Sequence, residues 1–292
     1  MQKFNVENHI ESILPDGNWA LVWADEFDGK ELDRTKWDTR LYMMGKRSLH
    51  WVEDAYELDG NGNIVFKIVK RDGRYCTTQL QTGYNFMDMP SEEYDTAAAE
   101  KRNENQKSDN YYNWPIGEIK EPKFMHKYGY YECRCKMQKN EGWWAAFWLQ
   151  SPIIGSTLNP EFSGVEVDIM EQFWRKKYEP HNSVQHINHW NGYGRQHQST
   201  DKKLVSLSET KDGYHTFGLE WSPDSYRYYV DGIMTWEVKA PFPISQTEQF
   251  ILLSTETVGY RSSGWNQWDD LEEAYRSGDT WTVDYVRVFE RK

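Results

Sequence analysis

Cysteines and long apolar runs are scarce in this sequence, and each shortage excludes a class of protein. Cys76, Cys133 and Cys135 are the only cysteines in 292 residues, an odd number with no Cys-x-x-Cys spacing. Neither a disulfide framework nor a cysteine zinc site is expected, and buried reduced thiols are the simplest state. No stretch approaches the ~20 apolar residues that a membrane-spanning helix needs, so no transmembrane segment is predicted.

Positive charge is also in short supply. The 34 Lys and Arg residues face 46 Asp and Glu residues, which leaves a formal net charge of -12. Because no basic stripe offsets this negative field, nucleic acid is not an expected partner. Helical periodicity is almost absent as well, whereas aromatic residues make up 16% of the chain and can both fill a core and line a groove.

Strand signals follow one another along the whole chain, with turn residues between them. Candidate strands lie at residues 19–23, 55–58, 64–69, 128–138, 144–149, 165–173, 184–190, 215–221, 226–230, 234–238, 250–255 and 282–290. Asp231-Gly232 predicts a hairpin, because glycine accepts the positive φ of a type I′ turn. The pattern predicts an all-β antiparallel sandwich that forms a single domain over residues 1–292, with one short helix at 269–276.

Three carboxylates lie within six residues of an apolar, β-branched run, where burying ionised groups is costly. The run predicts a strand in which Glu166 and Asp168 share one face and the apolar residues share the other. Glu171 has the opposite parity. A β-bulge between Ile169 and Met170 would add one unpaired residue and return Glu171 to the face of the other two carboxylates, and bulges are enriched beside active sites.

This spacing suits glycoside chemistry. With the bulge, the Cα atoms of the two glutamates lie roughly 13 Å apart, at about 3.3 Å per residue. Side chains that lean inward bring the carboxyls toward the ~5–5.5 Å separation of retaining glycosidases, and not the ~6.5–9.5 Å of inverting ones. One glutamate would then attack an anomeric carbon, and the other would protonate the leaving oxygen and later activate water.

Asp168 lies between the two glutamates and would disfavour full ionisation of the trio, which keeps a proton available on the acid. The alternative to catalysis is a solvated acidic strand face or a cation site. A third carboxylate with shifted parity, an apolar opposite face and the aromatic surroundings favour catalysis over a solvated face.

An aromatic run precedes the acidic strand and is expected to pair beside it as a hairpin. Trp144 and Trp148 share one face of that run and are predicted sugar platforms, with Phe147 and Leu149 in the core. Core packing is the alternative for aromatic residues on a strand. No metal is needed for the reaction, and a zinc site would require a converging set of ligands.

The spacing Glu166-x-Asp168-x-x-Glu171 resembles the catalytic signature of the family-16 glycoside hydrolases in its bulged form. The resemblance implies a β-jelly-roll sandwich of two curved antiparallel sheets, whose concave face is the substrate cleft. Carried over residue by residue, it makes Glu166 the nucleophile, Asp168 the assisting carboxylate and Glu171 the general acid/base. The family commonly has a site-lining histidine near the position of His189, and both His186 and His189 are placed close to the groove, with a structural role as the alternative.

Other segments carry the same resemblance across most of the chain. Residues 143–150 are similar to the family's Trp-Pro-Ala-Phe-Trp run, with alanine in place of the proline. Residues 23–29 and 283–288 are similar to its N-terminal motif and its closing strand. In relatives with a structural calcium, ligands come from these last two places. Glu26 and Asp284 are therefore candidate Ca²⁺ ligands, with ordinary surface polar contacts as the alternative.

We expect an endo-β-glycanase that acts on a polysaccharide with retention, as a monomer and with no required cofactor. Thr255-Glu256 followed by Tyr260-Arg261 is faintly similar to agarases and porphyranases, which makes Glu256 a candidate substrate contact, and the Asn-Glu-x-Gln segment of β-1,3-glucanases is absent. A β-galactan of agar or porphyran type and a β-1,3-glucan both stay open as substrates. The alternative function is a non-catalytic lectin or carbohydrate-binding module, which would use the same groove without needing three carboxylates.

Two long segments are expected outside the sandwich strands, and the first of them, residues 87–122, lacks periodicity. Residues 87–122 predict a polar surface excursion that either walls the cleft or is tolerated at an edge, and residues 260–277, with Trp265 and Trp268, are expected to border the groove. The N-terminal residues resemble no signal peptide. Because enzymes that act on polymers usually meet them outside the cytoplasm, a secreted, periplasmic or cell-surface location is expected.

Overall fold

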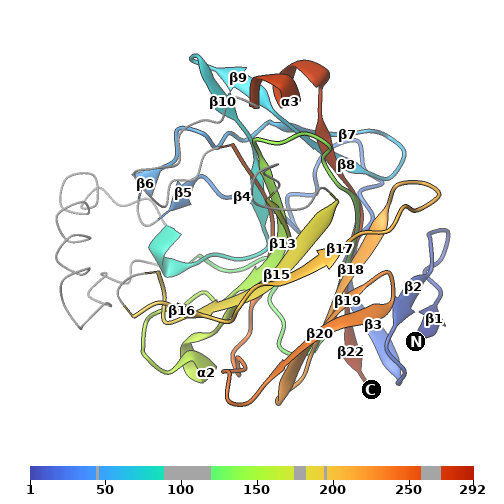
Figure 1. The fold of residues 1–292 in the computed structure, drawn as a ribbon, viewed down its shortest axis with the longest axis vertical. Coiled ribbons are helices and arrows are strands. Elements are labelled where there is room, and N and C mark those ends of the chain that lie inside the picture. Colours follow the sequence, from blue (N-terminus) through green and yellow to red (C-terminus); the bar gives the residue numbers. More distant parts are fainter. Residues whose placement is uncertain (44–45, 89–119, 174–181, 194–195, 258–270) are drawn as a thin grey trace.

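Two eight-stranded antiparallel sheets make up most of the protein (Figure 1). The computed structural model describes residues 1–43, 46–88, 120–173, 182–193, 196–257 and 271–292. Every strand pairing between named strands is antiparallel, so the predicted all-β antiparallel architecture is confirmed.

The first sheet contains the acidic strand, and we call it the carboxylate sheet. Its spatial order is β16 (Gln198–Ser199), β15 (Ser183–Trp190), β14 (Glu166–Phe173), β13 (Trp144–Gln150), β21 (Phe250–Glu256), β11 (Gln79–Gln81) and β4 (Asp38–Thr39), with β17 (Lys203–Ser206) also paired to β15. We call the other sheet the second sheet. Its order is β20 (Ile233–Lys239), β19 (Ser225–Val230), β18 (His215–Trp221), β12 (Gly129–Lys136), β22 (Thr280–Arg291), β8 (Ile64–Lys67) and β7 (Tyr56–Leu58), with β3 (Trp19–Asp25) also paired to β22.

Short elements complete the described chain. Three two-stranded pairs are β1 (Gln2–Phe4) with β2 (Ser12–Leu14), β5 (Tyr42–Met43) with β6 (Lys46–Arg47), and β9 (Val69–Arg71) with β10 (Arg74–Cys76). The helical elements are η1 (Phe86–Asp88), α2 (Pro160–Ser163) and α3 (Leu271–Ser277). The predicted helix at 269–276 corresponds to α3 over its described part.

The main core is a single cluster that contains residues from both sheets. Phe147 and Leu149 of β13 belong to it and are fully buried, as predicted, together with Cys133 and Cys135 of β12. All three cysteines are free and buried, which confirms the prediction of reduced thiols. Because side chains alternate along a strand, the opposite face of β13 and β14 is left for a site outside this core.

The predicted bulge is present in β14. Phe147 of β13 pairs with Met170, whereas its neighbour Trp148 pairs with Asp168, so Ile169 is the extra residue. The pairing of β14 with β15 shifts register over the same residues. Ile169 and Met170 are both buried in the main core, which is why the alternation restarts after them and Glu171 returns to the outer face.

All the strands predicted from the sequence are found, with shifts of one or two residues at their ends. One prediction merges two strands: the run at 64–69 is β8 followed by β9, which pairs with β10 apart from the second sheet. The Asp231-Gly232 turn joins β19 to β20, with φ of 49° and 76°. Very short strands such as β4 and β16 escape prediction because two residues carry no periodicity.

Both ends of the chain lie on the same side of the molecule in Figure 1. None of the helices in the described ranges is long and apolar enough to span a membrane. Residues 89–119 of the predicted excursion lie outside the described part of the chain, as do Arg261, Trp265 and Trp268 of the second predicted segment.

Candidate active site

One pocket on the outer face of the carboxylate sheet gathers the three carboxylates of β14. Its lining consists of Trp144, Ala146, Trp148, Glu166, Asp168, Glu171, Ser254 and Glu256. The residues come from the adjacent strands β13, β14 and β21. The pocket therefore brings together all three carboxylates, both tryptophans and Glu256, as the sequence predicts.

Glu166, the first residue of β14, is held by two neutral side chains. The Tyr193 hydroxyl donates a hydrogen bond to Oε2 of Glu166. The Gln150 amide donates to the same oxygen, at 3.3 Å, and also to the Tyr193 oxygen. Gln150 ends β13 and Tyr193 follows β15, so each flanking strand contributes one donor.

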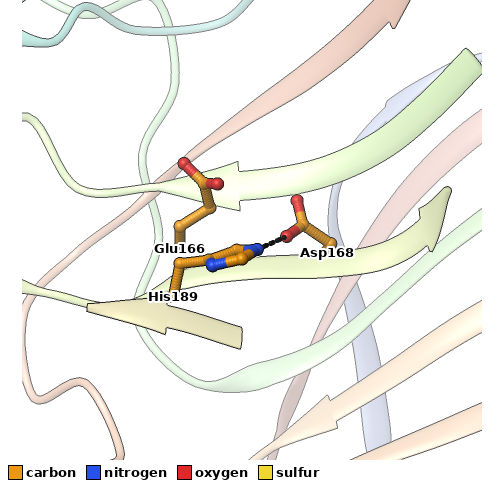
Figure 2. A group of neighbouring side chains, drawn as sticks. All are labelled: Glu166, Asp168 and His189. Carbon is orange, nitrogen blue, oxygen red and sulfur yellow. Dashed lines mark ion pairs between the residues drawn. The ribbon is translucent and has the colours of Figure 1, made fainter. Parts of the chain in front are cut away.

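Asp168 is the middle carboxylate and lies next to His189 of β15. Its Oδ2 is 3.6 Å from His189 Nε2, and Nδ1 of the same ring lies 2.9 Å from Nε2 of His197. Figure 2 shows Glu166, Asp168 and His189 converging from two neighbouring strands. One ligand atom from each lies within 4.8 Å of the others, which is a spacing that a metal ion could use.

Glu171, beyond the bulge, is oriented by an amide from β15. Gln185 Nε2 donates to Oε2 of Glu171 at 2.9 Å, and the two residues pair across β14 and β15. A neutral amide fixes the orientation of a carboxyl group without adding a full charge beside it.

The aromatic side of the pocket is more buried than the sequence suggests. Trp148 is only 6% exposed, its indole nitrogen donates to the Ser254 hydroxyl at 2.9 Å, and the Arg40 guanidinium lies over its ring. Arg40 also bonds to Oε1 of Gln79, whose amide nitrogen donates to Glu256 at 3.1 Å. Trp144 keeps the larger exposure of the two predicted platforms.

Sequence reasoning misses the supporting residues Arg40, Gln79, Gln150, Gln185 and Tyr193. The first two lie far from the acidic strand in the chain and reach it only through the sheet order. Gln150 and Gln185 could have been found, because each belongs to a strand predicted to flank β14. Tyr193 lies in a turn, where no periodicity fixes the direction of a side chain.

His186 does not line the site, so its placement near the groove is wrong. Alternation along β15 turns it into the interior, where its ring contacts the Ile169 carbonyl oxygen at 2.6 Å and the Thr235 hydroxyl at 3.0 Å. Burial lowers the pKa of His186 to about 4, so the ring is neutral. It is the structural histidine that the sequence left as the alternative, and His189 alone of the two faces the carboxylates.

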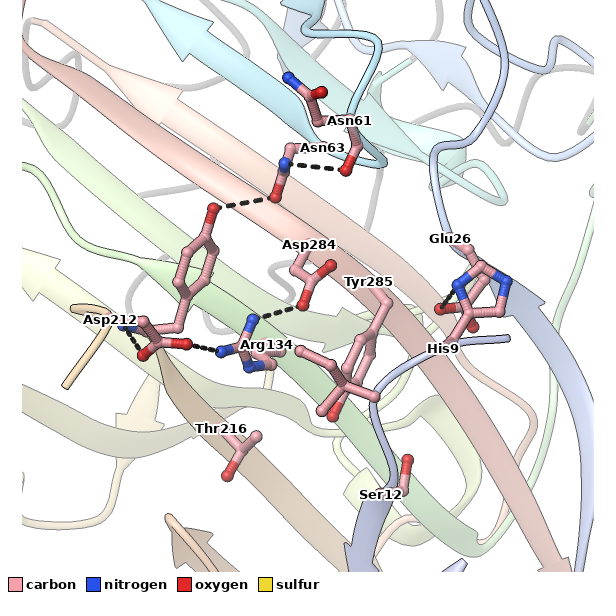
Figure 3. Close-up of polar contacts among 12 residues, drawn as sticks. His9, Ser12, Glu26, Asn61, Asn63, Arg134, Asp212, Thr216, Asp284 and Tyr285 are labelled. Atoms are coloured by element: carbon pink, nitrogen blue, oxygen red, sulfur yellow. Dashed lines mark hydrogen bonds and ion pairs between the residues drawn. The ribbon is translucent and has the colours of Figure 1, made fainter. Parts of the chain in front are cut away.

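The two candidate calcium ligands lie on the second sheet side, among arginines. Both carboxylate oxygens of Glu26 accept hydrogen bonds from Arg287, each at 2.8 Å. Asp284 accepts from Arg134, which also bonds Asp212; Figure 3 shows this pair of contacts and His9 beside Glu26. Burial raises the pKa of Asp284, and the bond from Arg134 opposes that shift.

The guanidinium groups of Arg287 and Arg134 thus occupy the positions next to Glu26 and Asp284 that a calcium ion would take. A Ca²⁺ ion binds six to eight oxygens, and here it would have to displace or share its ligands with an arginine. The donor set as it stands therefore fits ion pairing and does not fit a calcium site.

A β-sandwich with two glutamates, an aspartate and aromatic residues in one pocket defines a carbohydrate-active protein. Comparison with known proteins narrows this class. The model of glycosyl hydrolases family 16 matches residues 92–287, which is more than half of the chain. The chain belongs to glycosyl hydrolases family 16.

Individual relatives are distant. The chain is 24% identical over 290 residues to the glucan endo-1,3-beta-glucosidase A1 of Niallia circulans, covering 93% of this chain but only 38% of that protein. It is 24% identical over 315 residues to beta-porphyranase B of Phocaeicola plebeius, covering 97% of this chain and 89% of that one. The crystal structure of a laminarinase from Flavobacterium sp. UMI-01 has a TM-score of 0.64 at 20% identity, covering 93% of this chain and 100% of that chain, and shows the same jelly-roll fold.

Proposed function

We propose that the protein is a retaining endo-β-glycanase, which hydrolyses internal β-glycosidic bonds of a polysaccharide by double displacement. The observation that carries the proposal is the bulge at Ile169, because it brings Glu171 into the pocket of Glu166 and Asp168. Without it, the strand would present two carboxylates at period two and no partner for acid–base work. Membership of the family supports the same reaction class.

In the first step Glu166 attacks the anomeric carbon while Glu171 gives its proton to the leaving glycosidic oxygen. The bond from the anomeric carbon to that oxygen breaks and a glycosyl ester to Glu166 forms. In the second step Glu171 takes a proton from water, whose oxygen attacks the same carbon and releases Glu166. Asp168, between the two and paired with His189, assists by its charge.

The hydrogen-bond partners support this division of roles. Glu166 accepts hydrogen bonds from a hydroxyl and an amide on one oxygen, which fixes the orientation that a nucleophile requires. Glu171 lies in the same pocket beyond the bulge, where the Gln185 amide orients it toward the leaving glycosidic oxygen.

The stereochemical outcome is the direct test of the mechanism. Proton NMR of the first minutes of hydrolysis should show the β-anomer of the new reducing ends, ahead of mutarotation. An initial α-anomer would mean inversion and would overturn the assignment of Glu166 as nucleophile. Calorimetric binding of polysaccharide with no reducing-end release over days would favour a lectin instead.

We propose that the substrate is either a β-1,3-glucan or a β-galactan of agar or porphyran type. Relatives named for glucans and for porphyran both align over most of this chain, so identity alone does not separate them. Reducing-end release should be screened on laminarin, mixed-linkage glucan, agarose, porphyran and carrageenan. Product sizes from the active substrate then separate endo action, which gives mixed oligosaccharides early, from exo action.

We further propose that residues 1–292 act as one catalytic domain, as a monomer and outside the cytoplasm, where polymeric substrates are met. The proposed reaction uses Glu166 and Glu171 as its reacting groups and calls for no metal ion or organic cofactor. Size-exclusion chromatography with light scattering tests the monomer, and full activity after exhaustive treatment with chelator tests the absence of a required metal.

A further inference from the structure

The two oxygens of Glu166 are not equivalent in the structure. Oε2 accepts from the Tyr193 hydroxyl and from the Gln150 amide nitrogen at 3.3 Å. Within the described part of the chain, both hydrogen bonds to this carboxylate end on Oε2, and none ends on Oε1. A carboxylate held in this way presents one oxygen to its donors and the other to the pocket.

The donors themselves are held in place. Gln150 is fully buried at the end of β13, and its amide nitrogen bonds both the carboxylate and the Tyr193 oxygen. The Tyr193 ring packs against a small apolar cluster of Phe86, Met87 and Ile154, which lies apart from the main core. The position of the hydroxyl is therefore set by packing and by a second hydrogen bond.

We propose that Tyr193 and Gln150 are positioning residues that select Oε1 of Glu166 as the attacking atom and hold Oε2 throughout the reaction. This inference rests on the proposed double displacement. When the glycosyl ester forms, Oε1 bonds to the anomeric carbon and Oε2 becomes the ester carbonyl oxygen. The same two donors then face that carbonyl oxygen.

We call the two donors, Tyr193 and Gln150, the clamp. The clamp has its main effect on the second step. As water attacks the anomeric carbon, the bond from that carbon to Oε1 breaks and its electron pair returns to the carboxylate. Negative charge thus develops on both oxygens of Glu166, and donors already aimed at Oε2 stabilise it. In the first step the carboxylate loses charge, so the same donors give less advantage there.

Tyr193→Phe tests the inference, because it removes the hydroxyl and keeps the ring that packs on the apolar cluster. The probes are the 2,4-dinitrophenyl β-glycosides of laminaribiose and of neoagarobiose, using whichever the wild type turns over. Since dinitrophenolate leaves without help from the acid, glycosylation is fast and hydrolysis of the glycosyl-enzyme limits kcat. We expect kcat to fall on the order of 10-fold to 100-fold, below the 10²–10³ of a sole oxyanion donor because Gln150 remains.

The kinetic pattern separates this role from a general loss of structure. We expect KM to fall together with kcat, so that kcat/KM stays within about threefold of wild type. A burst of dinitrophenolate and a mass increase of one disaccharide on intact Tyr193→Phe protein should accompany it. Gln150→Leu should show the same pattern, and Tyr128→Phe, which removes a hydroxyl bonded to Gln246 away from the pocket, should show none of it.

The possible failures differ from one another. If the wild type releases neither dinitrophenolate nor reducing ends from any polysaccharide, the proposed function fails. If the wild type is active but Tyr193→Phe has normal kcat and no covalent intermediate, the clamp is refuted. Loss of kcat/KM with unchanged KM and no burst would also refute it, because the donors would then act in glycosylation.

Discussion

The carboxylates of the pocket and those of the second sheet side have different partners. In the pocket, Glu166 is bonded by a tyrosine hydroxyl and a glutamine amide, and a second glutamine amide orients Glu171. On the second sheet side, Glu26 and Asp284 each bond an arginine. Glu26 and Asp284 are thus held by guanidinium groups, whereas Glu166 is held by neutral donors.

This difference shows how one fold uses the same residue type for two purposes. A guanidinium bound through two hydrogen bonds stabilises a carboxylate but also occupies it. A neutral donor orients the carboxylate and leaves its charge available for a reacting carbon or proton. The comparison predicts that substitutions in the pocket change activity without much change in stability, and that substitutions in the arginine cluster do the reverse.

The largest effect is expected in the pocket. Glu166→Gln and Glu171→Gln should each reduce kcat on the polysaccharide by about 10³-fold or more, because each removes a reacting group. The thermal unfolding midpoint should stay close to that of wild type, since amide and carboxylate have the same shape. Near-normal kcat in either variant would contradict the role assigned to that residue. Glu161→Gln, at an exposed glutamate of α2, is the control.

The arginine cluster should give the converse result. Arg287 is fully buried and bonds both oxygens of Glu26. Arg287→Met leaves that carboxylate without its partner, and breaking a buried pair typically costs about 3 to 5 kcal/mol. Urea unfolding should show this loss of stability. The kcat of the variant, measured roughly 20 °C below its thermal unfolding midpoint so that the protein stays folded, should be near that of wild type. Arg276→Ala, at an exposed pair with Glu272, should cost under about 1 kcal/mol.

Much of the pocket could be predicted because it depends on one strand and its parity. The period of two placed Glu166 and Asp168 together, and the apolar residues around Ile169 and Met170 indicated where the bulge had to lie. The same alternation of side chains along a strand correctly predicted that Phe147 and Leu149 lie in the core. It could also have excluded His186, which has the opposite parity to His189 on one predicted strand.

The residues that support the carboxylates could not be predicted, because their positions depend on sheet order and on turns. Arg40 and Gln79 reach the pocket only because β4 and β11 lie beyond β21 in the carboxylate sheet. The arginine partners of Glu26 and Asp284 come from β22 and β12, which pair across a register that the sequence does not specify. Local patterns predict which face a residue takes, but not which distant residue meets it there.

A smaller effect is expected from a buried carboxyl that is bonded by a tyrosine hydroxyl. Glu132 of β12 is fully buried and bonds the Tyr285 hydroxyl at 2.6 Å, and burial raises its pKa to about 6. A raised pKa means that the folded protein loses stability as pH rises from about 4.5 through 6, when the unfolded chain ionises more readily. From that shift, the loss is about 2 kcal/mol by pH 8.

Glu132→Gln removes this titration. The free energy of unfolding of the variant, relative to wild type, should therefore rise by about 2 kcal/mol between pH 4 and pH 8. Urea titrations of both proteins at the two pH values measure the change. An unchanged difference across that range would mean that Glu132 titrates at its ordinary value, and kcat serves as the control because Glu132 lies outside the pocket.

The smallest effect is expected from calcium. Because Arg287 and Arg134 already pair with Glu26 and Asp284, adding millimolar Ca²⁺ or removing metal with chelator should leave the unfolding midpoint unchanged. A structural site filled to 100 times its Kd would add about 2.7 kcal/mol, which a thermal melt detects easily. Such a shift would contradict the comparison, since the carboxylates would then bind a cation despite their arginines. Arg134→Leu sharpens the test: it frees Asp284 from its partner, and any calcium response should appear first in that variant.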